Sequence, residues 1–453
     1  MQRSLFSPEV AQSLRYQQFQ QTELGRLRSV LPIKELSECL KKRQEKRGAP
    51  ARFDNVGKIA LQFLKAYLNL SDEKLLARLN TDWALQMFCG IDLGPNEMIR
   101  DKDLLWKIRA EVAGQLDVER MQKILIDAWK LDMHQTNIGL CDATCYESYI
   151  KYPTDQKLLF DCCIWLNKEI KNLAKSLSLR RPRNKFKDQK RKQLSFAKSK
   201  RKSYKKKRSR TRQLLYLLNK QLNQLEELLA YHYGQACSDP FLIDDFFIQR
   251  FQIIGKIYEQ QRFMYEHKVN SVPDRIVSLY KPYLRPIVRG KELKRVEFGA
   301  KFHTWQVDGL NFIEHFSFSN FHEGIRLKNG IAFHQKNFGK LNMIGADDIY
   351  PTNENRKFVS RFNIGTCFKP KGRRKTDPLI QKQEDKVRQA IGLARSTILE
   401  GSYGNDKNHY GLRKIKARNE LTEISWIFFG MMTANAVKMA KRFAKAPSAQ
   451  QRA

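Results

Sequence analysis

Residues 294–319 read KRVEFGAKFHTWQVDGLNFIEHFSFS, and this stretch decides the fold class. Two runs in which apolar and polar residues alternate flank the dipeptide Asp308-Gly309. Alternation with a period of two is typical of a half-buried strand, and Asp-Gly is a strong signal for a tight hairpin turn. The stretch therefore predicts a β-hairpin, which places a sheet in this part of the chain.

Further strand-like and helical segments lie on both sides of this hairpin. Residues 137–153, NIGLCDATCYESYIKYP, contain small and β-branched residues and predict a strand around one acid. After the hairpin, the expected order is a helix at 322–338, a strand at 342–347, a helix from Asn353, a strand at 364–369, and helices at 378–404 and 417–441. This order predicts an α/β fold, a mixed sheet flanked by helices.

The first 125 residues are predicted to be helical. Residues 1–50 form a polar helical segment that ends in a basic linker, and residues 51–125 form a small helical domain. From Asn55, apolar residues recur every three or four positions, as on amphipathic helices. Ser71 is well placed to cap the second of these helices, and Thr81 with Asp82 to start the third. Such a domain could read DNA, although dimerisation or packing is the simpler interpretation.

A helical block at about 155–268 follows the first strand, and its centre is strongly basic. Residues 180–212 hold 18 Lys and Arg against one acid, a local charge of +17 (18 − 1), while the whole chain carries +37. A surplus this large predicts a polyanionic partner, most commonly nucleic acid. We expect the run to contact DNA phosphates, with a solvated arm as the alternative. The candidate residues are Lys205, Lys206, Lys207 and Arg208.

Composition also argues against some protein classes. The most apolar run, Ile424–Ala440, is interrupted by polar residues and is shorter than the ~20 apolar residues of a membrane span. The amino terminus lacks the apolar centre of a secretion signal. The eight cysteines show no zinc-finger or disulfide spacing. We therefore expect an intracellular protein whose cysteines are reduced.

Three acids stand out because of their apolar surroundings. Cleavage of DNA without a covalent intermediate uses divalent metal ions held by carboxylates. Asp142 lies within GLCDATCYESY, Asp347 at the exit of NMIGAD, and Glu400 near the end of a helix. A buried acid without a partner costs free energy unless it binds a metal or another cation. Lys407 follows Glu400 by seven residues, on nearly the same helix face, and suits a DNA phosphate.

The residues alone leave other placements open, since a buried acid is as often paired with an arginine as bound to a metal. The alternatives are Glu147 and Asp155 for Asp142, Asp348 for Asp347, and Glu420 and Glu423 for Glu400. His322 could be a polar neighbour of a site, although a structural histidine is the more common case.

Five stretches of the chain resemble the DDE transposases of bacterial insertion sequences. They are DATCYESYIKYPTD (142–155), RIVSLYKPYLRPIVRGKELKRVEFGAKFH (275–303), VDGLNFIEHFSFSNFHEGIRL (307–327), GADDIYPTNENRKF (345–358) and ILEGSYGNDKNHYGLRKIKARNE (398–420). The similarity extends over about 20–125 and 136–442. It implies an RNase H-like catalytic domain at 136–453, interrupted by the basic helical insertion at 157–268, behind a small helical amino-terminal domain.

The resemblance also implies the catalytic and metal-binding residues. The first acid is Asp142, the second is Asp347, three residues before Tyr350, and the third is Glu400, followed by the motif's Lys407. Together the three acids would hold two Mg²⁺ ions, with Mn²⁺ able to substitute.

One part of the motif departs from the pattern of the family. In relatives, a Tyr and an Arg precede the Glu by seven and four residues. Here Leu393 and Ser396 occupy these places, and Arg395 is displaced by one. The sequence therefore leaves open whether Arg395 supplies the function of the family's Arg.

The resemblance implies a transposase that cuts DNA at insertion-sequence ends and joins them to target DNA. We expect a homodimer on DNA, in the bacterial cytoplasm with the nucleoid. Basic residues of 371–375 and 413–418 are expected to position phosphates; the named DNA contacts are Arg395, Lys407, Arg413 and Lys414. A transposase-derived DNA-binding protein that no longer cuts is the alternative, and a structural RNA-binding protein is a third candidate.

Overall fold

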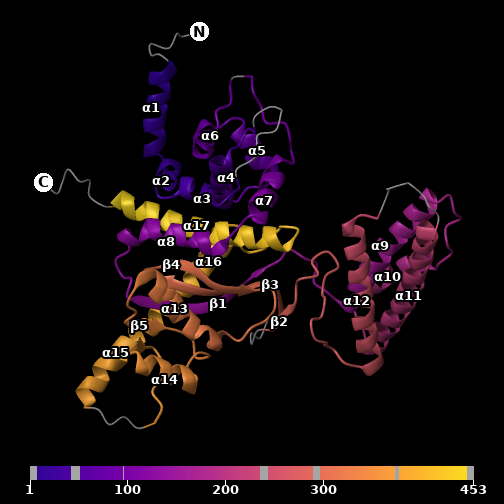
Figure 1. The fold of residues 1–453 in the computed structure, drawn as a ribbon. Coiled ribbons are helices and arrows are strands. Elements are labelled where there is room, and N and C mark those ends of the chain that lie inside the picture. Colours follow the sequence, from indigo (N-terminus) through magenta and orange to yellow (C-terminus); the bar gives the residue numbers. More distant parts are fainter. Residues whose placement is uncertain are drawn as a thin grey trace. The chain divides into compact units, whose positions relative to one another are not determined.

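The computed structural model describes residues 8–41, 51–94, 96–234, 243–288, 296–372 and 377–445. These residues form two compact units, each taken by itself below (Figure 1). Unit 1 combines Met1–Tyr149 with Gly299–Ala453, and unit 2 is Ile150–Phe298. The predicted basic linker falls almost entirely on residues 42–50, outside the described residues.

The amino-terminal part of unit 1 is helical, as the periodicity predicts. Its helices are α1 (Pro8–Gln21), α2 (Glu23–Ser29), α3 (Ile33–Ser37), α4 (Asn55–Leu68), α5 (Asp72–Leu79), α6 (Trp83–Cys89), α7 (Leu104–Gly114) and α8 (Val118–Trp129), followed by the 3-10 turn η1 (Lys130–Asp132). The Ser71 side chain accepts a hydrogen bond from the backbone N–H of Lys74, and Asp82 caps α6 in the same way. Both predicted helix starts are confirmed, because a side-chain oxygen satisfies a free N–H in each first turn.

A mixed sheet follows these helices. Its strands are β1 (Ile138–Glu147), β2 (Pro286–Val288), β3 (Val296–Val307), β4 (Leu310–Ser317), β5 (Met343–Gly345) and β6 (Gly365–Thr366). They are ordered β2-β3-β1-β5-β6, and β4 pairs with β3. β1 runs antiparallel to β3 but parallel to β5, and β5 is parallel to β6. The mixed α/β architecture is therefore confirmed.

The predicted hairpin joins β3 to β4. Asp308 and Gly309 have φ values of 49° and 75°, and Val307 pairs with Leu310 across the turn. Positive φ at both central residues is the geometry that favours Asp-Gly in a two-residue hairpin. The pairing register shifts between His303 and Thr304, which leaves Glu314 as an extra residue in β4.

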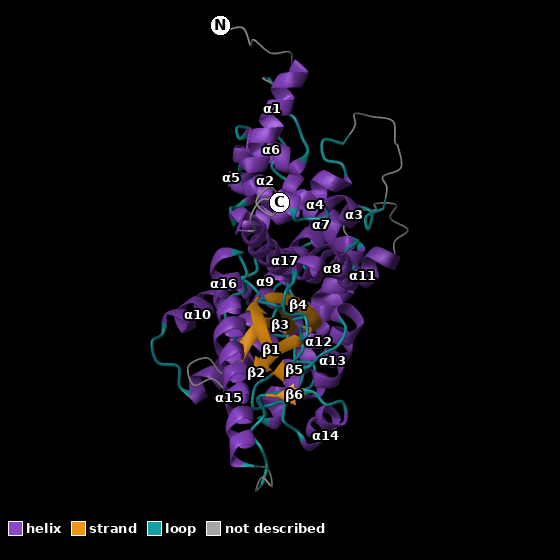
Figure 2. Cartoon of the chain, turned by 90° about the vertical axis from the view of Figure 1, so that its left-hand side faces the viewer, coloured by secondary structure: helices purple, strands orange, loops and turns teal. Residues whose placement is uncertain are grey.

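Different helices cover the two faces of this sheet (Figure 2). Trp305 lies on one face, where its ring packs against Gly330 of α13 (Leu327–Phe338). Successive strand residues point to opposite faces, so Gln306 lies on the other face. There its side chain hydrogen bonds to Ser402 of α16 (Glu400–His409). Asn435 of α17 (Glu420–Lys445) bonds to the backbone of Asn311 on β4, and so α17 also packs beside this strand.

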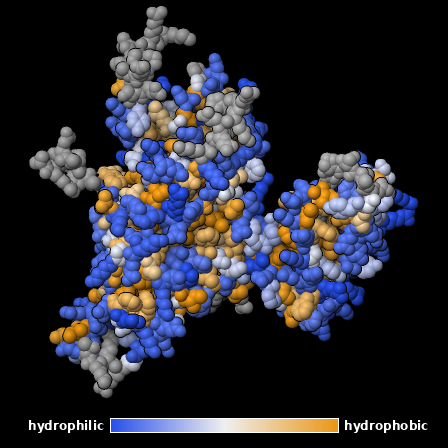
Figure 3. Space-filling model, in the orientation of Figure 1, coloured by the Kyte–Doolittle hydropathy of each residue, from blue (hydrophilic) through white to orange (hydrophobic). Residues whose placement is uncertain are grey.

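One long helical run carries the third predicted acid. It comprises α15 (Pro378–Ala394), a π-helical segment η3 (Arg395–Leu399) and then α16, without a break in helix. Before it lie the 3-10 turn η2 (Glu323–Arg326) and α14 (Asn353–Arg361). In the view of Figure 3, apolar side chains gather at the outer end of α15, where Leu379 is 73% and Ile380 is 48% exposed.

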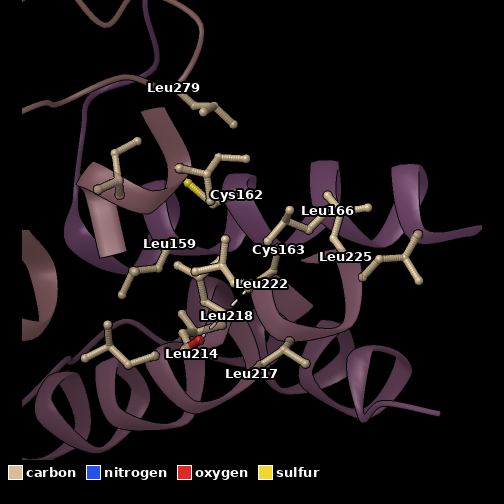
Figure 4. Close-up of a cluster of buried hydrophobic side chains, with 14 of the residues drawn as sticks. Leu159, Cys162, Cys163, Leu166, Leu214, Leu217, Leu218, Leu222, Leu225 and Leu279 are labelled. Atoms are coloured by element: carbon tan, nitrogen blue, oxygen red, sulfur yellow. Dashed lines mark hydrogen bonds between the residues drawn. The ribbon is translucent and has the colours of Figure 1, made fainter. Parts of the chain in front are cut away.

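Unit 2 is a helical body with a core of its own. It contains α9 (Asp155–Ser176), α10 (Phe186–Lys198), α11 (Tyr204–Gly234) and α12 (Asp245–His267). Buried leucines from α9 and α11 interdigitate around the adjacent Cys162 and Cys163 (Figure 4). The leucine spacing that predicted a helix or a coiled coil after residue 210 therefore forms the buried face of α11. The predicted insertion at 157–268 lies within this unit.

Candidate active site

The parallel pairing of β1 with β5 brings the first two predicted acids together. Leu140 of β1 is paired with Gly345 of β5, and Asp142 and Asp347 each follow these partners by two residues. Because the two strands are parallel and in register, Asp347 follows the end of β5 at the level of Asp142, which lies within the longer β1. The alternative acid, Asp348, has a side chain that is 78% exposed and pairs with Lys369 at 3.4 Å.

Asp142 lies in a buried, polar environment. Its side chain is 15% exposed, and its Oδ1 accepts a hydrogen bond from the Ala143 backbone N–H at 2.7 Å. Burial raises the pKa of Asp142 to about 6, a shift that the Ala143 hydrogen bond and the Arg395 charge oppose and the charges of Glu323 and Asp347 reinforce. Burial dominates because it removes water from the charged form of the carboxyl.

Arg395 joins all three predicted acids. Its Nη1 lies 3.2 Å from Asp142 Oδ2 and 3.3 Å from Glu400 Oε1, and its Nη2 lies 3.5 Å from Asp347 Oδ1. The Arg395 side chain is 15% exposed, whereas the side chains of Asp347 and Glu400 are about half exposed. The structure thus brings the three acids around one cation, with two of them open to solvent.

The three acids around the guanidinium do not have the arrangement of a metal site. Among the described residues, no group of three or more His, Cys, Asp or Glu side chains has the arrangement of a metal site. The three acids nevertheless share one partner within 3.5 Å.

A π-helical segment lies between Arg395 and Glu400. Arg395 is five residues before Glu400, and these residues span η3. A π-helix forms i→i+5 hydrogen bonds, one residue more than the α-helix. An Arg five residues before the Glu therefore lies on the same side as one four residues before it in an α-helix. The other two positions point elsewhere, since Leu393 is 63% exposed and Ser396 hydrogen bonds to the Leu393 carbonyl.

Two side chains of α16 extend the site along β1. Tyr403 donates a hydrogen bond from its hydroxyl to the Asp142 carbonyl oxygen at 3.2 Å. Lys407 donates from Nζ to Thr144 Oγ1 at 2.9 Å and lies 5.7 Å from the centre of the Tyr146 ring. The helix continues past Lys407, so this residue lies on the Glu400 side of the sheet, as the spacing predicts.

Asp406 is a buried acid that the sequence reasoning missed. Its carboxylate accepts a hydrogen bond from the Tyr146 hydroxyl at 3.1 Å, and it is 1% exposed. Burial raises the pKa of Asp406 to about 7, against the opposing charge of Lys438 and hydrogen bonds from Tyr146 and Asn311. In the sequence, Asp406 stands in a polar stretch, so no pattern distinguishes it from an exposed acid.

The rival acids have other partners. Glu147 pairs with Lys414, and Asp155 pairs with Arg275 at 2.5 Å. Glu423 is buried and accepts a hydrogen bond from Ser148 at 2.7 Å. Glu420 lies exposed at the start of α17. None of the four contacts Arg395 among the ion pairs of the described residues.

A second group of buried polar side chains includes His303, which pairs across the sheet with Ala143, the residue after Asp142. His303 is fully buried between Glu314 and the Tyr350 hydroxyl, at 2.7 and 2.9 Å. Glu323, whose charge acts on Asp142, pairs with Lys301 at 2.7 Å. The neighbouring His322 is exposed. In the stretch HEGIR (322–326), the charge of Glu323 therefore acts on Asp142. The sequence reasoning had considered only His322 there.

The predicted DNA-contacting residues divide by exposure. Lys205, Lys206 and Lys207 are exposed on α11, and Arg413 is exposed after α16. Arg208 is half-buried, because its guanidinium stacks 4.2 Å from the Tyr265 ring centre and bonds to the Tyr265 carbonyl.

Two further basic candidates are engaged within the protein. Arg210 is buried against Gln189 and Gln193 of α10, so this part of the basic run holds two helices together. Lys414 pairs with Glu147. The predicted phosphate contacts of residues 373–375 fall outside the described residues.

Comparison with known proteins adds one family. Residues 12–111, which comprise most of the helical amino-terminal part of unit 1, match the family model described as Transposase domain (DUF772). This match supports a transposase. It supports DNA as the partner and a DNA-recombining enzyme in general terms, since transposition acts on DNA. The chain matches no curated protein and no solved structure. In the described part of the chain, no helix has the length and apolar character needed to cross a membrane.

Proposed function

We propose that the chain is a DDE transposase that cuts DNA at insertion-sequence ends and transfers the strands into target DNA. The observation that carries this proposal is the convergence of Asp142, Asp347 and Glu400 on one guanidinium. The first two acids are separated by 205 residues (347 − 142), so they contact the same guanidinium only because the chain folds. The match of residues 12–111 to a transposase domain is independent support, because it lies outside these acids.

We expect the three acids to bind divalent metal ions through their carboxylate oxygens. Mg²⁺ prefers oxygen ligands and retains waters, so two or three carboxylates suffice. The Ala143 backbone N–H holds Asp142 Oδ1 by a hydrogen bond, and the half-exposed side chains of Asp347 and Glu400 present their oxygens to solvent. When bound by Asp142, Asp347 and Glu400, such ions would activate the attacking hydroxyl and stabilise the leaving oxygen. We expect Mg²⁺, with Mn²⁺ able to substitute.

The neighbouring residues hold the site in shape and bind the DNA strand. The Ala143 N–H fixes one oxygen of Asp142, and the Tyr403 hydroxyl holds the backbone of Asp142 to α16. Lys407 of α16 donates a hydrogen bond to Thr144, which lies on the same strand as Asp142. Its ammonium group would bind a DNA phosphate near the cleaved bond. The exposed lysines of α11 supply contacts that depend on the DNA backbone and not on base sequence.

The finer features of the family follow from the same proposal. We infer that the mixed sheet with its three acids is an RNase H-like core. Bringing two element ends together requires at least two protomers, so we propose a homodimer on DNA. The site of action would be the bacterial nucleoid in the cytoplasm.

The test is a cleavage assay on DNA that carries the element's terminal repeats, with Mg²⁺. Nicks at the repeat ends are expected from the wild-type chain and not from Asp142→Asn. Binding of the repeats without any nick, in Mg²⁺ or Mn²⁺, would favour a transposase-derived DNA-binding protein. Equal binding to unrelated RNA, with no preference for the repeats, would favour a structural RNA-binding protein.

A further inference from the structure

We propose that Arg395 and the divalent cation compete for the same three carboxylates, so that metal binding displaces the Arg395 guanidinium from the site. This inference rests on the proposed function, because it assumes that Asp142, Asp347 and Glu400 are the metal ligands. It adds a regulatory role for Arg395: the arginine partly neutralises the acids before the metal arrives and is released toward DNA when the metal binds.

Geometry makes the two occupants exclusive. Arg395 Nη1 lies 3.2 Å from Asp142 Oδ2 and 3.3 Å from Glu400 Oε1, so that one nitrogen contacts both oxygens. Mg²⁺ binds oxygens at about 2.0–2.1 Å, so two oxygens on one ion are at most ~4 Å apart. A guanidinium nitrogen in contact with both oxygens occupies the space where the shared ion would lie. Both cations therefore cannot be held at once.

Charge makes the exchange favourable. Three carboxylates with one guanidinium carry a net charge of −2 (−3 + 1), so Arg395 leaves the acids only partly neutralised. A divalent ion brings twice the charge on a smaller radius, and it binds in a site where Asp142 is largely shielded from water. Metal binding must nevertheless overcome the attraction of the acids for Arg395, which lowers the apparent metal affinity.

The surroundings provide a route for the exchange. Asp347 and Glu400 are 51% and 53% exposed, so an ion can approach them from solvent. Arg395 begins the π-helical segment, and its side chain extends from the helix into the site. Lys407 lies on the same helical run, beside β1. The released guanidinium would therefore add a second cation to the side of the site where we place the DNA phosphate.

Arg388 provides a matched control on the same helix. It is seven residues earlier on α15, its side chain is 20% exposed against 15% for Arg395, and it pairs with Glu384 and Asp385. Removing Arg388 deletes the same charge and the same kind of ion pair. In Arg388→Gln, the three acids of the proposed site still have Arg395 as their partner.

The experiment measures Mn²⁺ binding to the full chain without DNA, by calorimetry, for wild type, Arg395→Gln, Arg395→Lys and Arg388→Gln. We expect Arg395→Gln to bind Mn²⁺ about tenfold more tightly, the effect of ~1.4 kcal/mol, because the metal no longer displaces a cation. Arg388→Gln should bind as wild type does. Arg395→Lys should lie between them, since its ammonium reaches fewer of the oxygens at once.

Mn²⁺ affinity of Arg395→Gln equal to or weaker than wild type, with Arg395→Lys also unchanged, would overturn the competition. Asp142→Asn and Glu400→Gln separate that outcome from failure of the proposed function. If these two lose Mn²⁺ binding while Arg395→Gln binds as wild type does, the acids are ligands and only the competition is wrong. If both keep Mn²⁺ binding and cleavage, the proposed function itself is wrong. Circular dichroism of each variant shows that it folds.

Discussion

The Arg395 guanidinium lies 3.2 Å from the Asp142 carboxylate, although 253 residues separate them in the chain. Local sequence around Asp142 shows an acid without a partner, and the fold provides one from a distant helix. The same guanidinium reaches Asp347 and Glu400. This single residue therefore connects the three acids on which the proposed chemistry depends.

We predict that Asp142→Asn, Asp347→Asn and Glu400→Gln each abolish cleavage, by at least about 100-fold, while DNA binding is retained. A metal ligand serves the chemical step, whereas affinity comes mostly from Lys and Arg contacts with phosphates. The measurement is single-turnover cleavage in Mg²⁺ beside a binding assay. Asp348→Asn is the control and should remain active, because Asp348 is exposed and paired with Lys369. Near-normal cleavage by any of the three variants would remove that residue from the site.

The basic surface of unit 2 is predicted to supply much of the salt dependence of DNA binding. Replacing the six lysines within 198–207 by Gln should flatten the slope of log K against log salt, by up to about 0.9 for each DNA phosphate that a lysine no longer neutralises. These lysines are solvent-accessible, so their replacement should leave the helical core intact. The measurement is a set of binding titrations at several salt concentrations.

Lysines elsewhere in unit 2 provide the comparison for this prediction. Lys171, Lys175, Lys220 and Lys256 are exposed but lie outside the run at 198–207. Their replacement by Gln should change the slope less than replacement of four lysines of the run. An equal change would mean that the run has no special part in DNA binding and is a solvated surface.

Glu400 and Lys407 are predicted to fail in different ways. Glu400→Gln should lose metal-dependent cleavage at every DNA concentration, because a hard oxygen ligand is missing. Lys407→Ala should be partly rescued by more DNA or less salt, because an ammonium positions a phosphate. Single-turnover cleavage across DNA and Mg²⁺ titrations tests both. A Lys407→Ala defect that responds only to Mg²⁺ would contradict this division of roles.

Asp406 is predicted to make folding stability depend on pH. Burial raises the pKa of Asp406 to about 7, so the folded state holds the proton more tightly than the unfolded state. The resulting stabilisation is present at low pH and is lost as pH rises from about 4 to 7. Between pH 4 and pH 8, wild type should lose up to about 4 kcal/mol more unfolding free energy than Asp406→Asn.

Urea unfolding of both proteins across this range provides the measurement for Asp406. Asn at this position can still accept the Tyr146 hydrogen bond, although it removes the charge that faces Lys438. Burial lowers the pKa of Lys438, and Lys438 is present in both wild type and Asp406→Asn. Parallel pH profiles for wild type and Asp406→Asn would show that Asp406 does not titrate here. Asp348→Asn, at an exposed position, should follow the wild-type profile.

The local parts of the fold could be predicted from the sequence. The Asp308-Gly309 turn, the Ser71 and Asp82 caps and the long helices depend on residues within a few positions of one another. The order of strands and helices followed from the same patterns. Short strands such as β6 (Gly365–Thr366) were located less closely than the helices, because two paired residues leave little pattern to read.

The sequence by itself determined the mixed α/β class, the helical amino-terminal part, the basic charge of the insertion and the acids worth testing. These follow from local periodicity, turn chemistry and charge, which act between neighbours in the chain. Only the tertiary structure decided that Arg395 meets the acids through a π-helical turn, that Arg210 is buried, and that Asp406 is enclosed. Each of these depends on contacts between segments far apart in the chain, and burial is a property of the packed whole.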